Sequence, residues 1–593
     1  MKIIQNIGMT VFIAASALLV ILLFFNSYTL TTESLSDAIS DKQERQQISE
    51  ALAPMINMPY AYNHSFIQQI NTHLNEANEL IKRRYEITDE EVRQVASLYP
   101  EKNIIYNNDV ISGAFGQEDT DLYKAQKLKE YTSWMNDRQF ATREELQDQL
   151  SSSQGNINSA IIRDKGYGDD KIKALKLAVT SQSSHGPLAQ NPALWLLLTI
   201  GLGIVGALMY ILPKLKKLPG IKNDDIFHSA NSGRGWIAYS IGTVLIAFYI
   251  ILYWFPEYMT SWMILVDPVS KALNGNAASQ WFFYGFLYTL AIAVMGLRMI
   301  IKYRHSQYQI IRTCSVIFFQ TAFAFLIPEI LIRLNRPSMD LKNIWPLNYT
   351  FFFDYNIEHL THSGRLGMAM LVWGIILIIV AVPVITYFFG KRWYCSWVCG
   401  CGGLAETLGD PYRQLSDKSV TAWKVERWMI HGVLVFAVLM TAGVLYTYFT
   451  GSSELLGINT YDLRSTYGFL IGAAFAGVVG VGFYPLMGNR VWCRFGCPLA
   501  AYLGIIQRFK SRFRITTNGG QCISCGNCST YCEMGIDVRW YAQRGQNIVR
   551  ASCVGCGVCS SVCPRGVLKL ENNDSDRFAE PLLIGNDGVK IKA

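Results

Sequence analysis

Two cysteine-rich runs, CISCGNCSTYC at 522–532 and CVGCGVCSSVCP at 553–564, decide the fold of the last part of this chain. Both have the spacing Cys-x2-Cys-x2-Cys-x3-Cys, which is typical of proteins that hold two cubane [4Fe–4S] clusters. Three closely spaced thiolates can cap one face of a cubane, and a distant fourth thiolate completes its ligands. Zinc sites usually pair two Cys-x2-Cys units and do not need eight cysteines in this double pattern.

The fourth cysteine of each run is expected to serve the cluster of the other run. The predicted ligands are Cys522, Cys525, Cys528 and Cys563 for one cluster, and Cys553, Cys556, Cys559 and Cys532 for the other. Glu533 follows Cys532 where proline is usual, which we expect to change the exposure and potential of the second cluster. The sequence thus predicts a two-cluster ferredoxin-like α+β domain over residues 501–593.

The rest of the chain has the composition of a polytopic α-helical membrane protein. Of its 593 residues, 50% are hydrophobic and only 17% are charged, against about 25% charged in soluble proteins. Runs of about 20 apolar residues can cross a bilayer. We expect eight spans: Gly8–Tyr28, Leu194–Leu212, Trp236–Phe255, Trp281–Ile301, Cys314–Ile332, Leu366–Phe389, Met429–Phe449 and Phe469–Met487.

Basic residues follow every second span, and such loops lie on the cytoplasmic side. They are Lys214, Lys216, Lys217, Lys222, Lys302, Arg304, Arg312, Lys391, Arg392, Arg413, Arg490, Arg494, Arg508 and Lys510. Both termini are then cytoplasmic and residues 31–191 extracytoplasmic, in a bacterial inner membrane. The loop with Arg333, Arg336 and Lys342 departs from the alternation, because it is basic but is predicted to lie outside.

The extracytoplasmic segment is predicted to be mainly helical. Apolar residues recur at helical spacing from Phe66 to Ile81, and Thr88 with Glu91 has the pattern of a capping box. Thr142 with Glu145 has the same pattern. We see no catalytic constellation there. The expected order is an anchor (1–30), this domain (31–191), spans two to six (192–390), a cytoplasmic loop (391–428), spans seven and eight (429–500) and the ferredoxin domain.

A second cysteine pattern is repeated at the ends of two spans. Arg392-Trp-Tyr-Cys395-x3-Cys399 follows span six, and Arg490-Val-Trp-Cys493-x3-Cys497-Pro498 follows span eight. The four thiols could form one further metal or cluster site near the cytoplasmic interface, with Cys401 as a substitute ligand. Redox-active disulfides and simple packing at helix ends are the alternatives, although a reducing cytoplasm disfavours static disulfides.

The segments WYCSWVCGCGGLAETLGD and VWCRFGCPLAAYLG, with the ferredoxin runs behind them, resemble the NapH/NosR family of membrane polyferredoxins. The resemblance covers roughly Trp236 to Leu570. It implies electron transfer beside periplasmic nitrate or nitrous oxide reductases, and it equates Cys395/Cys399 and Cys493/Cys497 with the two CxxxCP motifs of the family, although the first motif lacks its proline. The NosR branch carries flavin on a threonine, but Ser112-Gly113-Ala114-Phe115 has no acceptor threonine, so covalent flavin is not expected here.

Ionisable groups at membrane depth are often functional. Glu329, near the outer end of span five, and His359 and His362, before span six, could accept protons from a quinol on the outer side; the alternative is that they are solvated interfacial residues.

The pattern Gly201-x-Gly203-x2-Gly206 lies inside span two without a preceding strand, so we interpret it as helix packing rather than a dinucleotide site. Nothing in the sequence suggests a nucleic-acid partner.

Two functions fit these features. The first is an electron-transfer component, such as a quinol dehydrogenase, that passes electrons between the quinone pool or a cytoplasmic donor and an extracytoplasmic reductase or electron carrier, as in anaerobic respiration or denitrification. The second is a redox-sensing or metalloenzyme-maturation protein whose outer domain engages a partner. Bound quinone or quinol-dependent cluster reduction would favour the first.

Overall fold

The computed structural model describes residues 1–116, 118–216, 231–451, 454–455 and 457–572, together with 584–585 and 588–589. Most of these residues are helical, and the chain divides into two compact units. The first, called here the membrane unit, comprises Met1–Val20, Pro192–Phe255 and Leu265–Ala593. The second, called here the acidic unit because residues 31–190 have 24 Asp and Glu against 17 Lys and Arg, comprises Ile21–Asn191 and Pro256–Ile264. Lys217 and Lys222, two of the basic residues used to predict sidedness, lie outside the described residues.

The described residues contain eight helices long and apolar enough to cross a membrane, which confirms the predicted number of spans. They are Lys2–Phe24 (α1, η1), Pro192–Lys216 (α10, η5, α11, η6), Trp236–Trp254 (α13), Gln280–Lys302 (α15), Gln307–Arg333 (α16, η8, α17), Gly364–Phe389 (α19, η9, α20), Val420–Thr450 (α23) and Thr460–Gly482 (α24, η11, α25). The seventh span begins nine residues before the predicted Met429. There the Ser419 side chain accepts a hydrogen bond from the Ala422 N–H and caps the helix.

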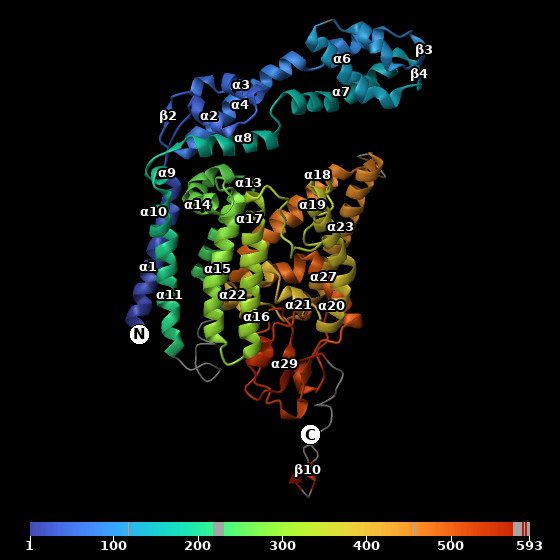
Figure 1. Cartoon of the computed structure of the whole chain (residues 1–593). Helices are drawn as coiled ribbons and strands as arrows, with labels where there is room; N and C mark the ends of the chain where they lie inside the picture. The colour runs from blue at the N-terminus through green and yellow to red at the C-terminus, as the bar shows by residue number, and fades with distance from the viewer. Residues whose placement is uncertain are drawn as a thin grey trace. The chain divides into compact units, whose positions relative to one another are not determined.

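Helices α1 and α11 (Leu202–Ile211) lie side by side in the membrane unit (Figure 1). A Cβ atom added at Gly206 would lie 2.7 Å from both the Gly8 carbonyl oxygen and the Phe12 nitrogen. Small residues allow this close approach of two membrane helices. The glycine pattern of span two therefore contributes to helix packing.

Short helices follow spans six and eight and position the second cysteine pattern. After span six come α21 (Arg392–Cys395) and α22 (Gly400–Thr407). After span eight come α26 (Tyr484–Met487), the π-helical turn η12 (Trp492–Gly496) and α27 (Pro498–Lys510). Helix α27 packs against α20 (Val382–Phe389) and α23, so the chain turns back along the spans instead of leaving them.

The acidic unit consists mainly of helices around two hydrophobic cores. Its helices are α2 (Thr32–Ala38), α3 (Lys42–Ala51), α4 (Asn63–Tyr85), α5 (Asp89–Ser97), α6 (Asp119–Thr132), α7 (Arg143–Lys165), α8 (Asp169–Gln182) and α9 (Pro187–Gln190). Its strands form the sheet β2-β1-β5 (Pro59–Tyr60, Ser27–Thr29, Ser184–His185) and the antiparallel pair β3 (Lys102–Ile105) and β4 (Gln139–Thr142). Thr88 and Glu91 form the full capping box of α5, whereas the Glu145 carboxylate accepts from the Ala141 N–H, one residue before the expected partner.

The acidic unit also includes Pro256–Ile264, a segment that follows span three in the sequence. The buried Glu257 carboxylate lies 3.1 Å from the Lys176 ammonium, and its backbone carbonyl accepts a hydrogen bond from the Asn63 amide at 3.2 Å. These contacts join residues about 80 to 190 positions apart in the chain, which is why hydropathy and local pattern did not predict them.

Candidate iron–sulfur sites

The C-terminal part of the membrane unit repeats one loop twice beside a small antiparallel strand pair, β8 (Arg514–Thr517) and β9 (Leu568–Glu571). In each loop a glycine with positive φ, Gly526 at +80° and Gly557 at +73°, precedes a one-turn helix. These helices are α28 (Asn527–Thr530) and α30 (Val558–Ser561), and each contains the third cysteine of its run. Glycine adopts this backbone conformation without a steric penalty, so the sequence repeat becomes a structural repeat.

The first set of predicted ligands, called here the distal group, lines one hollow. Its members are Cys522, Cys525, Cys528 and Cys563. Burial, together with the proximity of Cys563, Cys525 and Cys522, raises the pKa of the Cys528 thiol to about 12. The fourth cysteine of the second run therefore lies with the first three of the other run. That these four thiols hold one cluster stays a prediction.

The second set, called here the proximal group, gathers around Cys559. Burial raises the pKa of this thiol well above its usual value, and Cys556, Cys553 and Cys532 add to the effect in that order. Burial likewise raises the pKa of Cys553 to about 11. Thiols in such surroundings are protonated when free, so a metal centre must displace their protons.

Membrane-unit helices hold the loop that contains the proximal group. From α16 (Gln307–Phe318), the Tyr308 hydroxyl donates to the Gly555 carbonyl at 2.8 Å, and the Gln309 amide donates to the Cys556 carbonyl at 2.8 Å. From α27, the Gln507 amide donates to the Cys553 carbonyl at 2.8 Å. The proximal group is thus docked on the spans, whereas Cys525 of the distal group is exposed.

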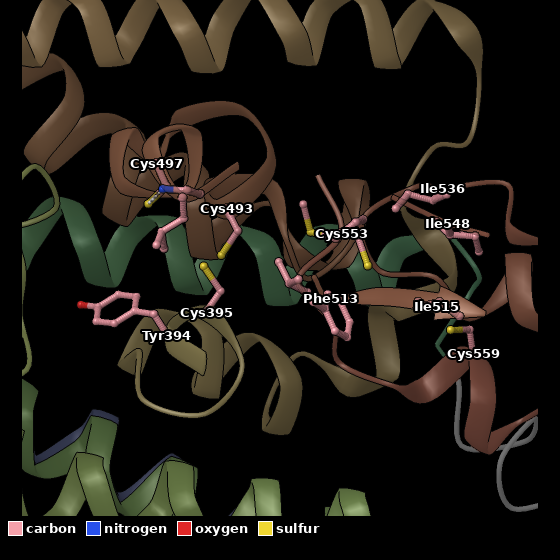
Figure 2. Packing of buried hydrophobic residues seen from close by; sticks show 14 of the residues in the cluster. Tyr394, Cys395, Cys493, Cys497, Phe513, Ile515, Ile536, Ile548, Cys553 and Cys559 are labelled. Carbon is pink, nitrogen blue, oxygen red and sulfur yellow. Dashed lines mark hydrogen bonds between the residues drawn. The ribbon is translucent and has the colours of Figure 1, made fainter. Parts of the chain in front are cut away.

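The cysteines of the repeated membrane pattern also converge. Cys395, Cys399, Cys401, Cys493 and Cys497, called here the inner group, line one small hollow closed by Tyr394, Trp492, Leu499 and Ala500. Figure 2 shows the side chains of Cys395 and Cys493 pointing toward one another, with Cys553 and then Cys559 following along the same core. Among the described residues that line this hollow, the metal-ligating groups are the five thiols and the Tyr394 hydroxyl, which suits a thiolate-bound centre.

Two helix N-termini meet at the inner group. Cys399 is the N-cap of α22, and Cys497 is the N-cap of α27, where its sulfur accepts a hydrogen bond from the Ala500 N–H at 3.4 Å. Pro498 at the first position of α27 needs no hydrogen bond there. The positive ends of helix dipoles stabilise negative charge, so both motifs provide a favourable environment for thiolates.

The inner group lies deeper than predicted. The Tyr502 hydroxyl donates to the carbonyl of Ile378, near the middle of span six, at 3.2 Å. A Cβ atom at Gly400 would lie 2.6 Å from the side-chain oxygen of Gln320, near the middle of span five. Helix α27 has 13 residues, about 20 Å of helix, between Cys497 and its basic end. The thiols are therefore inside the bundle, not at its interface, because both motifs turn back along the spans.

The basic loop between spans five and six also turns inward. The backbone carbonyl of Lys342 accepts a hydrogen bond from the Tyr394 hydroxyl at 2.9 Å. The mostly buried ammonium of Lys342 lies 3.0 Å from the Asp340 carboxylate. Ile344 of the same loop belongs to the core around Cys395. Because Arg333 and Gly364 are at the opposite end of the spans from Gly390, this loop must fold along the bundle to reach Tyr394. Lys342 is thus a mostly buried residue beside the inner group and not an outer-surface charge.

The two arginines of the repeat are not equivalent. The guanidinium of Arg490 lies 3.5 Å from the Cys493 sulfur. Arg392 instead stacks on the Phe513 ring at 4.5 Å and donates to the Asn572 side chain. Only Arg490 is therefore close enough to compensate thiolate charge, a difference that the matching sequences do not reveal.

The residues predicted to take protons from quinol have separate hydrogen-bond partners. Glu329 in α17 (Ile327–Arg333) accepts a hydrogen bond from the Asn274 amide at 2.6 Å. His362 in α18 (Asp354–His362) contacts the Glu358 carbonyl at 2.8 Å, and both histidines of that helix are exposed. Within the described ranges, no hydrogen bond or ion pair joins Glu329 to His359 or His362. Their role in quinol chemistry stays a prediction.

Two protein families match the segments that hold these cysteines. The family described as "4Fe-4S binding domain" matches residues 372–419 and 468–516, which contain the inner group. The family described as "4Fe-4S dicluster domain" matches residues 521–568, which contain the distal and proximal groups. The chain thus carries 4Fe–4S ferredoxin-type domains.

Curated relatives are similar over part of the chain. The "Putative electron transport protein YccM" of Escherichia coli (strain K12) is 28% identical over 27% of this chain and 46% of its own length. The "Methylamine utilization ferredoxin-type protein MauN" is 23% identical in Methylobacillus flagellatus, over 25% of this chain and 50% of the relative. In Methylorubrum extorquens it is 25% identical, over 34% of this chain and 66% of the relative. The chain spans about half the length of most of these relatives, and no solved structure matches it.

Proposed function

We propose that this protein transfers electrons along a line of three iron–sulfur centres, from the distal cluster through the proximal cluster to a centre held by the inner group inside the membrane. The observation that carries the proposal is the convergence of the inner thiols midway along the spans, in continuity with the core that contains Cys553 and Cys559. A centre at that depth shortens the distance that an electron must cross between the two membrane faces.

The ligands that we propose for the inner centre are Cys395, Cys399, Cys493 and Cys497, two from each motif. Cys401 has no counterpart in the second motif, where Leu499 occupies the equivalent position. When bound, such a cluster supplies one-electron chemistry. The chain's own contribution is to exclude water, to hold four thiolates, and to stabilise their charge with two helix N-termini and Arg490.

We propose a cytoplasmic donor or the quinone pool at one end of this line and an extracytoplasmic reductase system, such as nitrate or nitrous oxide reduction, at the other. The ferredoxin-type and electron-transport names of the relatives support electron transfer in general. The resemblance to membrane polyferredoxins supports the choice of partner. The exposed Cys525 edge of the distal group offers an entry point for a soluble donor.

Iron and sulfide analysis of the full chain purified in detergent tests the proposal. Three [4Fe–4S] clusters require about twelve iron atoms per chain, whereas the ferredoxin clusters alone require about eight. Redox-titrated EPR should then resolve three centres, and addition of a quinol should reduce at least one of them if quinol is the donor. A preparation with both ferredoxin signals but only about eight iron atoms would contradict the inner centre.

Sidedness can be measured with an impermeant thiol reagent on intact cells. Leu122 in the acidic unit and Trp540 in the ferredoxin domain are 53% and 43% exposed, so cysteine at either position should be reachable from its own side. We expect the Leu122→Cys variant to be labelled in intact cells and the Trp540→Cys variant only after permeabilisation, each compared with the parent chain. Labelling of Trp540→Cys in intact cells would mean that the ferredoxin domain lies outside, and it would contradict the proposed direction of electron flow.

A further inference from the structure

A set of buried charged residues fills the space between the inner and proximal groups. Three arginines and two glutamates, at most 2% exposed, form what we call the ion network: Arg312, Arg413, Arg490, Glu406 and Glu533. The Arg490 guanidinium lies 2.5 Å from the Glu406 carboxylate and 2.9 Å from that of Glu533. Arg413 pairs with Glu533 at 2.5 Å, and Arg312 pairs with Glu406.

The network touches both groups of thiols. At one side the Arg490 guanidinium contacts the Cys493 sulfur at 3.5 Å and the Cys395 carbonyl at 3.4 Å. At the other side Glu533 directly follows Cys532, and the carboxylates of Glu406 and Glu533 lie within 4.8 Å of the Cys556 sulfur. A chain of direct contacts therefore runs from Cys493 through Arg490 to Glu533 and the backbone of Cys532.

The network has more positive than negative charge. Asp410 pairs with Arg298, Lys302 and Arg413, which brings the connected set of described residues to five cations and three carboxylates. Among the described residues, Nη2 of Arg413 and Nε of Arg490 also have no hydrogen-bond partner although they are buried. Burying charged groups is unfavourable unless they are compensated. An excess of cations at this position suits two neighbouring centres whose thiolate ligands make them anionic.

Glu533 provides negative charge at the centre of this network. Its carboxylate pairs with two guanidinium groups, those of Arg413 and Arg490. Since it occupies the position after the fourth cysteine, where proline is usual, this charge is a specific feature of the chain.

We infer that Arg490 is a positioning residue that couples the inner and proximal centres, so that its charge sets the reduction potential of both and stabilises the electron on either one. The inference rests on the proposed inner centre. In the transfer step the reduced proximal cluster loses one electron and the inner centre gains it. No bond forms or breaks, and no proton is required. Cationic charge next to a centre favours its reduced form, because reduction adds negative charge.

Redox-titrated EPR on the full chain tests the coupling with charge changes of opposite sign. We expect Arg490→Gln to lower the potentials of the inner and proximal centres, Glu533→Gln to raise both, and Arg490→Lys to remain near the parent values. The distal potential should stay unchanged in all three. Arg539→Gln is the matched control, because Arg539 lines the hollow of the distal group; it should shift the distal potential alone.

Iron content, measured on the same samples, separates the possible outcomes. If Arg490→Gln loses its clusters, the inner and proximal potentials of Glu533→Gln and Arg490→Lys still show whether charge in the network sets both potentials. Full iron content with unchanged inner and proximal potentials in Arg490→Gln, or in Glu533→Gln, would overturn the inference. A parent protein without an inner signal would contradict the proposed function instead, and with it the coupling. A shift confined to one of the two centres would show that Arg490 acts locally and would also overturn the inference.

Discussion

Replacement of Cys493 by alanine is expected to remove the inner centre and to stop electron transfer from the proximal cluster to an acceptor on the far side of the membrane. About four of about twelve iron atoms should be lost, because a [4Fe–4S] cluster is held by four cysteine thiolates and alanine removes one of them. The ferredoxin clusters should remain, since the eight cysteines of the two C-terminal runs are untouched. Iron analysis and the EPR signals of the variant measure both effects.

The same loss is expected from Cys395→Ala, which removes a ligand from the other motif. Residues that act as one unit give non-additive effects, so the double variant should be no worse than either single variant. Cys314→Ala is the control, because this exposed thiol of span five lies outside every cysteine group. Normal electron transfer and full iron content in Cys395→Ala and Cys493→Ala would mean that these thiols only pack the core.

Cys401→Ala tests the choice of ligands within the inner group. Cys401 lines the same hollow as Cys399. We expect the variant to keep about twelve iron atoms, with at most a changed EPR line shape, because the surroundings of the centre change while its four proposed ligands remain. If Cys401→Ala loses the centre and Cys399→Ala retains it, the two cysteines exchange roles.

Replacement of Cys563 by serine is expected to damage the distal cluster, although Cys563 belongs to the run that supplies most of the proximal ligands. The physical reason is its position in the hollow lined by Cys522, Cys525 and Cys528. About four iron atoms should be lost, and any spin coupling between the two ferredoxin clusters should disappear. The EPR spectrum of Cys563→Ser should match that of Cys522→Ser.

Cys532→Ser is the reciprocal variant, and its spectrum should match that of Cys553→Ser. If Cys563→Ser instead resembled Cys553→Ser, each run would hold its own cluster and the crossed assignment would be wrong. Because the distal cluster is the proposed entry point, Cys563→Ser should also stop reduction by a soluble donor. The proximal and inner centres should still be reduced by a small chemical reductant.

Features with a local cause can be predicted from the amino-acid sequence alone. Cysteine spacing within eleven residues, with a glycine before each one-turn helix, is enough to specify the two ferredoxin loops. Continuous apolar runs specify the eight spans, since a helix satisfies its backbone hydrogen bonds within its own segment. The glycine contacts between α1 and α11 were likewise predictable, because in a membrane helix a small residue has few uses other than close packing.

The depth of the inner group and the surroundings of its charges depend on tertiary packing and could not be predicted from local sequence. The repeated motifs predicted that four thiols would meet, but whether the chain leaves the membrane or turns back after Gly390 and Gly488 depends on packing against other spans. Arg392 and Arg490 occupy the same place in the two motifs, yet of these two arginines only Arg490 reaches a thiol. The guanidinium of Arg392 instead contacts the Phe513 ring and the Asn572 side chain. Lys342 and Glu533 obtain their roles from partners about 40 to 120 residues away, and contacts at such separation depend on the whole fold.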